Sequence, residues 1–344
     1  MDNVLVIRFG SLGDVVLTLP VLAALRRQAP DARISVAVKE EFASLFDGRP
    51  EGVSVRPFQR SGRHRGLRGL RRYARELTRD GFGLIVDLHA SVRSRLLTRL
   101  VDAPRVLRVS SRHLRRRALV RFRKPLLGYP GHLVDRYLEV LGDRTDAPVD
   151  RRPRLPVSED GRAQLDAQLA ATGVRREDPL VVVAPGAGRA AKRWPADRYA
   201  AVAGRLAVEQ SMTVISTGAE GEADLVRQVV EQTGDRRVHA FVSSSLSQQA
   251  ALLARASRLI TNDSGLMHLG VAVGTPVLAL FGPTAPSLGF YPLGEKDRVL
   301  SVPLDCRPCS LHGPDRCPKG HHACMDAIAV EQVLEAVVGG GEGA

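Results

Sequence analysis

The chain has 344 residues, of which 44% are hydrophobic and 25% are charged, and this composition is typical of a globular protein long enough for two domains. No apolar run approaches the roughly 20 residues that a membrane-spanning helix needs, since Val15–Leu25 is interrupted by Thr18 and Pro20. The N-terminal residues lack the basic region of a signal peptide, so we expect a cytoplasmic protein.

The net charge of +13 is unevenly distributed along the chain. Residues 1–155 contain 32 Lys and Arg against 16 Asp and Glu, whereas residues 156–344 contain 18 against 21. Eight arginines and no acid lie between Arg56 and Arg75, and no acid lies between Asp102 and Asp135. These stretches could be solvated faces of an arginine-rich protein. Their concentration in one half favours an anionic partner, which would be a phosphorylated glycolipid, an anionic membrane surface or a nucleic acid.

Short apolar runs alternate with amphipathic segments in the first half of the chain. The pattern indicates a long helix over residues 14–28 and further helices between the later apolar runs. Buried parallel strands are predicted over residues 4–7, 34–38, 84–88 and 105–109.

The second half of the chain repeats this pattern. The predicted strands cover residues 180–184, 212–216, 259–261 and 276–281. The predicted helices cover residues 196–210, 220–232 and 264–273. Alternating strands and helices predict an α/β fold with two Rossmann-like domains that face each other across a cleft. We place the domains at residues 1–150 and 151–325, followed by a C-terminal helix and tail over 326–344.

The first chemically distinctive loop follows the first predicted strand and reads Arg8-Phe9-Gly10-Ser11-Leu12-Gly13-Asp14. Its two glycines allow a tight turn and a close approach to a ligand, and the helix behind them offers free amide groups. It is not the Gly-x-Gly-x-x-Gly fingerprint of dinucleotide binding. Asp14 is either a first-turn acid that complements the helix dipole or a general base that projects into the cleft.

The second loop combines Ala184-Pro185-Gly186-Ala187-Gly188 with Lys192-Arg193-Trp194-Pro195. A glycine-rich turn at a strand end, followed by two cations, supplies the backbone donors and charges that a diphosphate requires. The Gly-Lys-Ser/Thr ending of a nucleotide-hydrolysing P-loop is missing. The alternative interpretation is an incidental loop before a helix.

The third loop is Thr261-Asn262-Asp263-Ser264-Gly265-Leu266-Met267-His268. Asp263 or Ser264 is expected to cap a helix whose first amides form an anion site. His268 would lie on the first helical turn, either near that site or as a structural hydrogen-bonding residue.

Together with Gly274-Thr275-Pro276 and Leu280-Phe281-Gly282-Pro283-Thr284, these three loops resemble the signatures of glycosyltransferase family 9, the heptosyltransferases. The resemblance extends from about Val4 to Met325. It implies a GT-B fold and an ADP-heptose donor held mainly by the C-terminal domain. It also implies a lipopolysaccharide precursor as acceptor on the N-terminal domain, either a Kdo- or a heptose-bearing lipid A.

The resemblance also implies roles for individual residues. Asp14 would be the general base, and Lys192 would hold the donor diphosphate. The other donor-binding residues would be Gly186, Ala187, Glu222, Asp263, Ser264, Gly265 and His268. The acceptor-binding residues would be Ser11, Gly13, Arg68, Arg71 and Arg72. The chain departs from some members of the resembled family by placing glycines in the second loop where those members have hydroxyl residues.

The expected reaction is one direct displacement that inverts the anomeric carbon, with negative charge growing on the leaving diphosphate. The chain has no Asp-x-Asp motif for a catalytic metal ion. Lys192 and the helix that follows Ser264 can stabilise the leaving group instead, so we expect no cofactor for catalysis. We expect a monomer that contacts the anionic inner leaflet of the inner membrane.

Four cysteines lie within 19 residues, at Cys306, Cys309, Cys317 and Cys324. Their spacing resembles a structural zinc loop. Free thiols and an iron–sulfur cluster are the alternatives, and a disulfide is disfavoured in a cytoplasmic protein.

Other functions explain fewer of these features. Nucleic-acid binding would account for the arginines, but aromatic residues make up only 4% of the chain and the three loops would have no role. A nicotinamide oxidoreductase would need the absent glycine fingerprint. Within the resembled family, the alternative is a transferase that uses another nucleotide sugar.

Overall fold

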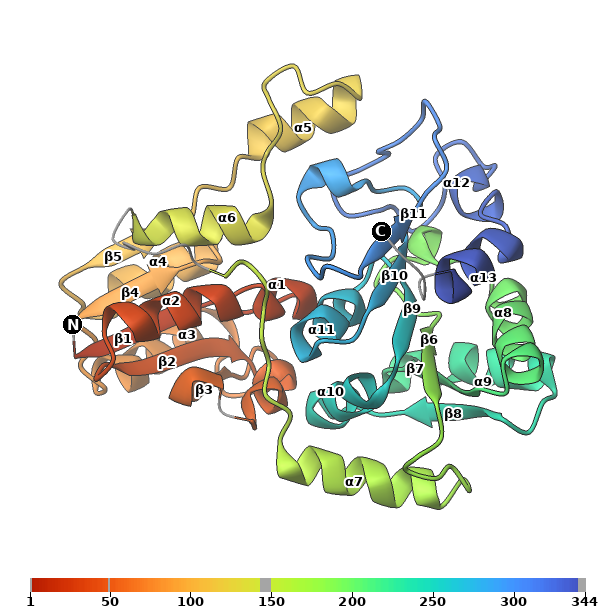
Figure 1. Cartoon of the computed structure of the whole chain (residues 1–344). Helices are drawn as coiled ribbons and strands as arrows, with labels where there is room; N and C mark the ends of the chain where they lie inside the picture. Colours follow the sequence, from red (N-terminus) through yellow and green to blue (C-terminus); the bar gives the residue numbers. More distant parts are fainter. Residues whose placement is uncertain (1, 49, 143–149, 340–344) are drawn as a thin grey trace. The chain divides into compact units, whose positions relative to one another are not determined.

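The computed structural model describes residues 2–48, 50–142 and 150–339 (Figure 1). It divides into two compact units. The first comprises residues 1–111 and 132–158, and the second comprises residues 112–131 and 159–344. The division therefore falls after residue 158 rather than after 150, and the arginine-rich segment 112–131 groups with the second unit. The C-terminal helix expected over 326–344 is also part of the second unit.

The described residues of the first unit form a five-stranded parallel sheet with the order β3-β2-β1-β4-β5 (Figure 1). Its strands are β1 (Asn3–Ile7), β2 (Arg33–Lys39), β3 (Ser54–Phe58), β4 (Leu84–Asp87) and β5 (Val106–Arg108). Every residue of the central strands β1 and β4 is buried. This pattern is typical of a parallel sheet that helices cover on both faces.

The first unit's helices are α1 (Leu12–Val16), α2 (Leu19–Gln28), α3 (Gly66–Thr78), α4 (Val92–Leu100) and α6 (Leu133–Leu138). Its 3₁₀ turns are η1 (Glu40–Phe46), η2 (Pro50–Gly52) and η3 (Glu139–Leu141). The single helix expected over 14–28 is divided in two, because Pro20 lies in the first turn of α2. The core joins Leu5 and Ile7 of β1 to Leu70 and Tyr73 of α3.

The described residues of the second unit form a six-stranded parallel sheet with the order β11-β10-β9-β6-β7-β8. Its strands are β6 (Leu180–Ala184), β7 (Thr213–Gly218), β8 (Val238–Val242), β9 (Arg258–Asn262), β10 (Val277–Leu280) and β11 (Arg298–Leu300). The central strand β6 is buried throughout.

The second unit's helices are α5 (His113–Phe122), α7 (Glu159–Ala170), α8 (Ala196–Glu209), α9 (Ala223–Thr233), α10 (Leu246–Arg255), α11 (Gly265–Val273), α12 (Ala323–Asp326) and α13 (Val330–Val338). Its 3₁₀ turns are η4 (Ala190–Lys192), η5 (Glu220–Glu222) and η6 (Pro286–Leu288). Trp194 and Tyr199 pack in its core with residues of α8 and α13. Among the described residues, no helix is long and apolar enough to cross a membrane.

Each sheet reverses its strand order at one point, between β1 and β4 in the first unit and between β6 and β9 in the second. In open parallel sheets, ligands bind in the crevice beyond the carboxyl ends of the two strands at this switch point. Ile7 pairs with Asp87 in the first unit, and Ala184 pairs with Thr261 in the second. All three distinctive loops therefore begin at a switch point. The α/β class and the Rossmann-like pattern of each half are confirmed.

Candidate active site

Asp14 lies in the first turn of α1, just after the loop that leaves β1. Its Oδ2 atom accepts hydrogen bonds from the Ser11 amide at 3.0 Å and the Ser11 hydroxyl at 2.9 Å, and it pairs with Arg8 Nη2 at 2.6 Å. All of these contacts fall on Oδ2, and within the described part of the chain they are the only ones that the carboxylate makes. One oxygen is therefore held in place, and Oδ1 makes no hydrogen bond within the described residues.

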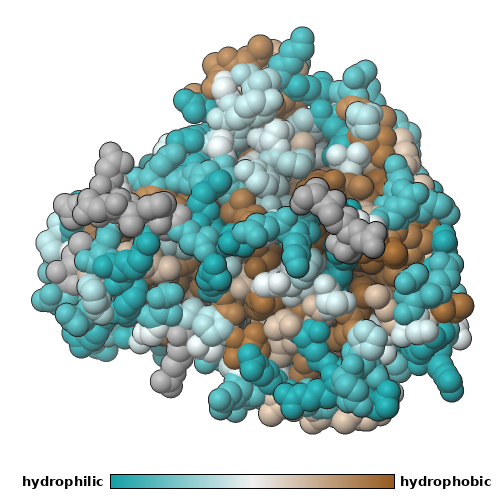
Figure 2. Space-filling model, in the orientation of Figure 1, coloured by the Kyte–Doolittle hydropathy of each residue, from teal (hydrophilic) through white to brown (hydrophobic). Residues whose placement is uncertain are grey.

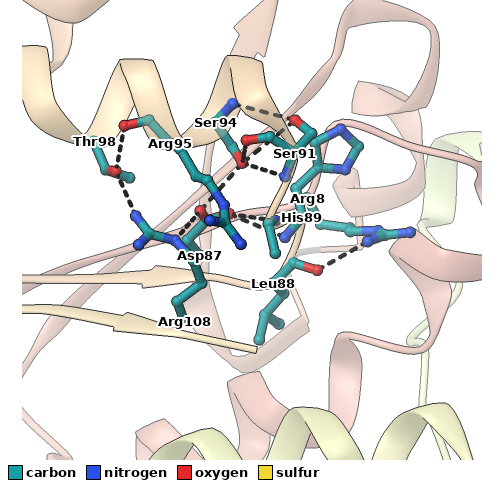
Figure 3. Close-up of polar contacts among 10 residues, drawn as sticks. Arg8, Asp87, Leu88, His89, Ser91, Ser94, Arg95, Thr98 and Arg108 are labelled. Carbon is teal, nitrogen blue, oxygen red and sulfur yellow. Dashed lines mark hydrogen bonds and ion pairs between the residues drawn. The ribbon is translucent and has the colours of Figure 1, made fainter. Parts of the chain in front are cut away.

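The charge of Arg8 keeps Asp14 ionised. Burial alone would raise the pKa of Asp14, but the Arg8 guanidinium and the hydrogen bonds from Arg8 and Ser11 outweigh it and hold that pKa below its ordinary value. Arg8 is itself tied to the neighbouring strand end, because its Nη1 donates to the Leu88 carbonyl at 2.8 Å (Figure 3). Arg8 is part of the first motif, but the sequence assigned it no role.

A buried carboxylate organises the loop that follows β4 (Figure 3). Asp87 Oδ1 accepts from the amides of His89 at 3.1 Å and Ala90 at 2.9 Å. Asp87 Oδ2 accepts from the Ser94 hydroxyl at 3.1 Å and from Arg108 Nε at 2.9 Å. This network fixes the backbone around Leu88, whose carbonyl accepts from Arg8. Asp87 therefore stabilises the position of Arg8, which pairs with Asp14. Sequence analysis missed it, because a single acid at a strand end is not a distinctive motif.

His89 stands at the same switch point. Burial, with the charge of Arg8 as a second cause, lowers its pKa to about 4, so the imidazole is neutral at physiological pH. Its ring meets the edge of Phe9 with the centroids 5.3 Å apart. Neutral imidazole beside the Arg8–Asp14 pair can donate or accept a hydrogen bond without changing the charge of the site.

The acceptor-side predictions fall in three places. Ser11 is exposed and bonds to Asp14, whereas Gly13 is buried in α1. Arg68, Arg71 and Arg72 are exposed on α3. The pocket nearest to them in sequence, of about 350 Å³, has other arginines in its wall. It is lined by Arg60, Ser61, His64, Arg65, Gly66 and Arg93.

In the second unit, Lys192 and Asp263 meet at the strand ends. Lys192 Nζ lies 2.7 Å from Asp263 Oδ2, and both side chains are largely buried. The Thr284 hydroxyl donates to the same oxygen at 2.6 Å. Asp263 therefore orients the lysine and, as an anion, would repel a phosphate in direct contact. Thr284 was quoted in the last motif without a role, and the structure adds it to the site.

Asn262 joins the second loop to the third. Its Nδ2 donates to the carbonyls of Pro185 at 2.8 Å and Gly186 at 3.2 Å, and its Oδ1 accepts from the Trp194 amide at 3.0 Å. One buried amide thus holds both ends of the segment that carries Lys192. Sequence analysis did not include Asn262 among the site residues, although it lies within the third motif.

Gly186 and Glu222 are brought into direct contact. A Cβ atom placed on Gly186 would lie 2.1 Å from Glu222 Oε1, so a side chain at this position would displace the Glu222 carboxylate. Glu222 Oε2 also accepts from the Ala219 amide at 3.2 Å. The prediction that the two residues share one site is consistent with this contact. Ala187 is buried in the same loop, and its carbonyl accepts from Arg193.

The remaining donor-side residues belong to α11. Ser264 occupies the N-cap position, but its side chain makes no capping hydrogen bond and lies instead 3.2 Å from the Thr261 hydroxyl. Gly265 is the first helical residue. His268 is buried in α11, and its place in the donor site stays a prediction.

The four cysteines are all free thiols, with Cys324 buried and the others half-buried. Burial raises the pKa of Cys324 to about 11 and also raises the pKa of Cys309. Thiolates suit zinc chemically, but among the described residues no group of three or more metal-binding side chains is arranged to hold an ion. The geometry does not support the predicted zinc loop, which stays a prediction.

Two Rossmann-like units with ligand loops at their switch points match the GT-B fold of glycosyltransferases. The model of "Glycosyltransferase family 9 (heptosyltransferase)" matches residues 70–317. The chain therefore belongs to glycosyltransferase family 9, and both the predicted family and the predicted enzyme class are confirmed.

Named relatives agree with this assignment. "Lipopolysaccharide heptosyltransferase 1" of Pseudomonas aeruginosa is 28% identical over 316 residues, covering 89% of this chain and 86% of that protein. A solved family 9 glycosyltransferase from Veillonella parvula matches with a TM-score of 0.83 and 26% identity over 99% of this chain and 98% of its own. The Escherichia coli "ADP-heptose lps heptosyltransferase II" matches with a TM-score of 0.76 and 23% identity over 99% and 98% of the two chains, a likeness of fold.

Proposed function

We propose that this enzyme transfers a heptose from ADP-heptose to the inner core of a lipopolysaccharide precursor, with inversion at the anomeric carbon. Family membership and the names of the relatives support the donor and the acceptor. The observation that carries the chemistry is the Asp14 carboxylate, which is ionised and held through one oxygen at the switch point of the first unit.

The second unit would bind the donor. Lys192 would turn from Asp263 towards the diphosphate, while Thr284 keeps Asp263 in place. The amides at the start of α11 add partial positive charge near the same position. Glu222 would accept hydrogen bonds from the ribose hydroxyls above Gly186. Charge that grows on the leaving ADP would thus meet a lysine and a helix terminus, so the proposed mechanism needs no metal ion.

The first unit would bind the acceptor. An acceptor hydroxyl placed at Oδ1 of Asp14 would give its proton to that oxygen as it attacks the anomeric carbon. The new glycosidic bond forms while the bond from that carbon to the diphosphate oxygen breaks, and ADP leaves. Arg8 would stay on Oδ2 and hold the carboxylate in its orientation. The carboxylates and phosphates of the acceptor would meet Arg60, Arg65 and Arg93 around the first unit's pocket.

The test is a transfer assay with purified lipid A acceptors and a panel of ADP- and UDP-sugars, run with and without EDTA. We expect a product heavier by one heptose from ADP-heptose, inverted at the anomeric carbon by NMR, and equal rates in EDTA. Efficient transfer from another nucleotide sugar, with ADP-heptose inactive, would replace the donor in this proposal. A loss of activity in EDTA that added Mg²⁺ restores would remove its metal-independent mechanism.

A further inference from the structure

Residues 112–131 expose an unusual group of large apolar side chains. Five of the eleven that are exposed in the described part of the chain fall within this segment. They are Leu114, Phe122, Leu126, Leu127 and Tyr129. Figure 2 shows hydrophobic surface at the top of the view, over the part of the chain that contains α5. Exposed apolar clusters of this kind mark interaction surfaces.

A tight turn places two of these side chains at its tip. The Gly128 amide donates to the Pro125 carbonyl at 2.7 Å, so Pro125 and Gly128 are the outer residues of a four-residue turn. Leu126 and Leu127 are its central residues, with 61% and 54% of their surface exposed. Gly128 adopts a φ of +76° that strongly favours glycine. The turn therefore presents two adjacent leucines to the solvent.

The same segment is strongly cationic. It carries no acid, and within the described residues none of its five exposed cations has a carboxylate partner. These cations are Arg115, Arg117, Arg121, Arg123 and Lys124. Unpaired cations beside exposed leucines and a tyrosine are typical of segments that lie in the headgroup layer of an anionic bilayer.

The segment is fixed at its base. Arg112 Nη1 donates to the Pro130 carbonyl at 2.8 Å, which joins its two ends. Arg116 is buried, with its guanidinium 5.0 Å from the centre of the Phe290 ring and a hydrogen bond to the Leu311 carbonyl at 3.4 Å. Arg116 thus anchors α5 to the rest of the second unit, while Arg115 and Arg117 on either side of it are exposed. A fixed base lowers the ordering cost of placing the turn in a surface.

We propose that residues 114–129 dock the enzyme on an anionic lipid bilayer, with Leu126 and Leu127 inserted among the acyl chains and the surrounding cations on the lipid phosphates. The charge of the segment selects this partner, because an apolar contact between protein chains would leave five cations unpaired. The biological use of this docking rests on the proposed function, whose acceptor is a glycolipid.

The test is co-sedimentation of the full-length enzyme with vesicles of phosphatidylcholine alone or mixed with phosphatidylglycerol. Neither contains an acceptor, so the result is independent of heptose transfer. We expect binding only to the anionic vesicles. Leu126→Ser/Leu127→Ser should weaken it on the order of tenfold per leucine. Val208→Ser is the matched control, because Val208 lies in the same unit with 62% of its surface exposed and should bind as the wild type does.

The charge is tested separately. Arg115→Gln/Arg117→Gln/Arg121→Gln should weaken vesicle binding about 100-fold at low salt and reduce its salt dependence. Arg162→Gln/Arg176→Gln/Arg236→Gln changes three exposed arginines elsewhere in the second unit and should have little effect. Wild-type binding by both segment variants, or equal wild-type binding to both kinds of vesicle, would overturn the proposal.

A third variant covers the case in which the serine substitutions harm folding. Leu127→Trp places a fluorophore at the tip of the turn, and Val208→Trp is its control. Brominated lipids in anionic vesicles should quench the first and not the second. Equal quenching would overturn the insertion of the turn. A dimer found without lipid and lost in Leu126→Ser/Leu127→Ser would assign the turn to a protein contact instead.

Discussion

Lys192 Nζ and Asp263 Oδ2 lie 2.7 Å apart at the carboxyl ends of β6 and β9, so the cation proposed to bind the donor is already paired before the donor arrives. Breaking a largely buried pair of this kind by removing one partner leaves the other partner uncompensated. In the proposed function, Lys192 would exchange Asp263 for a phosphate oxygen when the donor binds.

Lys192→Ala should weaken the binding of ADP far more than that of adenosine, because the lost interaction is with phosphate. The loss of the cation also leaves Asp263 uncompensated beside the diphosphate. Calorimetry with both ligands measures the difference, and Lys296→Ala, at an exposed lysine of the same unit, is the control. Equal losses for both ligands would point to a misfolded loop.

Asp14→Asn should lower turnover by about 10²–10⁴-fold, while the dissociation constant of ADP stays near that of the wild type. The amide keeps the shape of the carboxylate but cannot take the proton. Single-turnover kinetics measure the chemical step, with Asp31→Asn as a surface control. Turnover near the wild-type rate would remove Asp14 from the role of base.

The lowered pKa of Asp14 predicts the pH dependence of catalysis and of stability. The carboxylate stays ionised down to a pH below the usual range for aspartate, so the acid limb of kcat/KM should lie there. Arg8→Gln removes the charge that lowers this pKa while burial remains, so the limb should move to higher pH. A profile that Arg8→Gln leaves unchanged would assign the limb to another group.

The lowered pKa of Asp14 also makes the stability of the folded protein depend on pH. A depressed carboxylate pKa stabilises the protein above the pKa of the unfolded chain, and this contribution disappears as the pH falls through the folded value. Unfolding midpoints across that acid range should therefore fall more steeply for the wild type than for Arg8→Gln.

Gly186→Ala should raise the KM for the sugar nucleotide several-fold without unfolding the protein. The added methyl group overlaps the Glu222 carboxylate, and because a side chain can move, Glu222 would shift away from the ribose position. Gly188→Ala is the matched control, because no atom of the described residues lies within 4 Å of its added carbon. A KM for Gly186→Ala equal to that of Gly188→Ala would separate Glu222 from donor binding.

Neutralising Arg60, Arg65 and Arg93 together should raise the KM for the acceptor more than neutralising Arg68, Arg71 and Arg72, because only the first set lines the pocket. The second set acts through a field that salt screens over about 8–10 Å, so its effect should fade at high salt. The KM for ADP-heptose should stay the same in both. Measuring the KM for the acceptor at two salt concentrations separates the effects of the two sets. If neither set changes this KM, the arginines have no role in acceptor binding and are only solvated.

The sequence was most informative where burial is complete. The apolar runs of β1, β4 and β6 mark the centre of each sheet, and the loops that follow them hold Asp14 and Lys192. Strand β3 was missed because it lies at a sheet edge, is partly exposed and contains Pro57. Strand β11 was missed for a similar reason, because it lies at an edge of the second sheet, has only three residues and is partly exposed.

The contacts within each site could not be read from the sequence. The role of Asp263 depends on Thr284 and Lys192, which are distant along the chain and meet only because β9, β10 and the Lys192 loop share one edge of the sheet. The network around Asp87 likewise needs Arg108 from the next strand. Spacing identifies which loops carry chemistry, but tertiary pairing decides which atoms face each other.

Trp194 is the single tryptophan of the chain and is almost fully buried beside the Lys192 loop. Its indole donates to the Ile328 carbonyl at 3.1 Å, and its amide bonds to Asn262. Intrinsic fluorescence at tryptophan wavelengths therefore reports the melting of the second unit, while circular dichroism reports both. If the two signals diverge along a urea titration, the halves of this transferase unfold as separate cooperative blocks, and the donor-binding half can be followed in the unmodified enzyme without any added label.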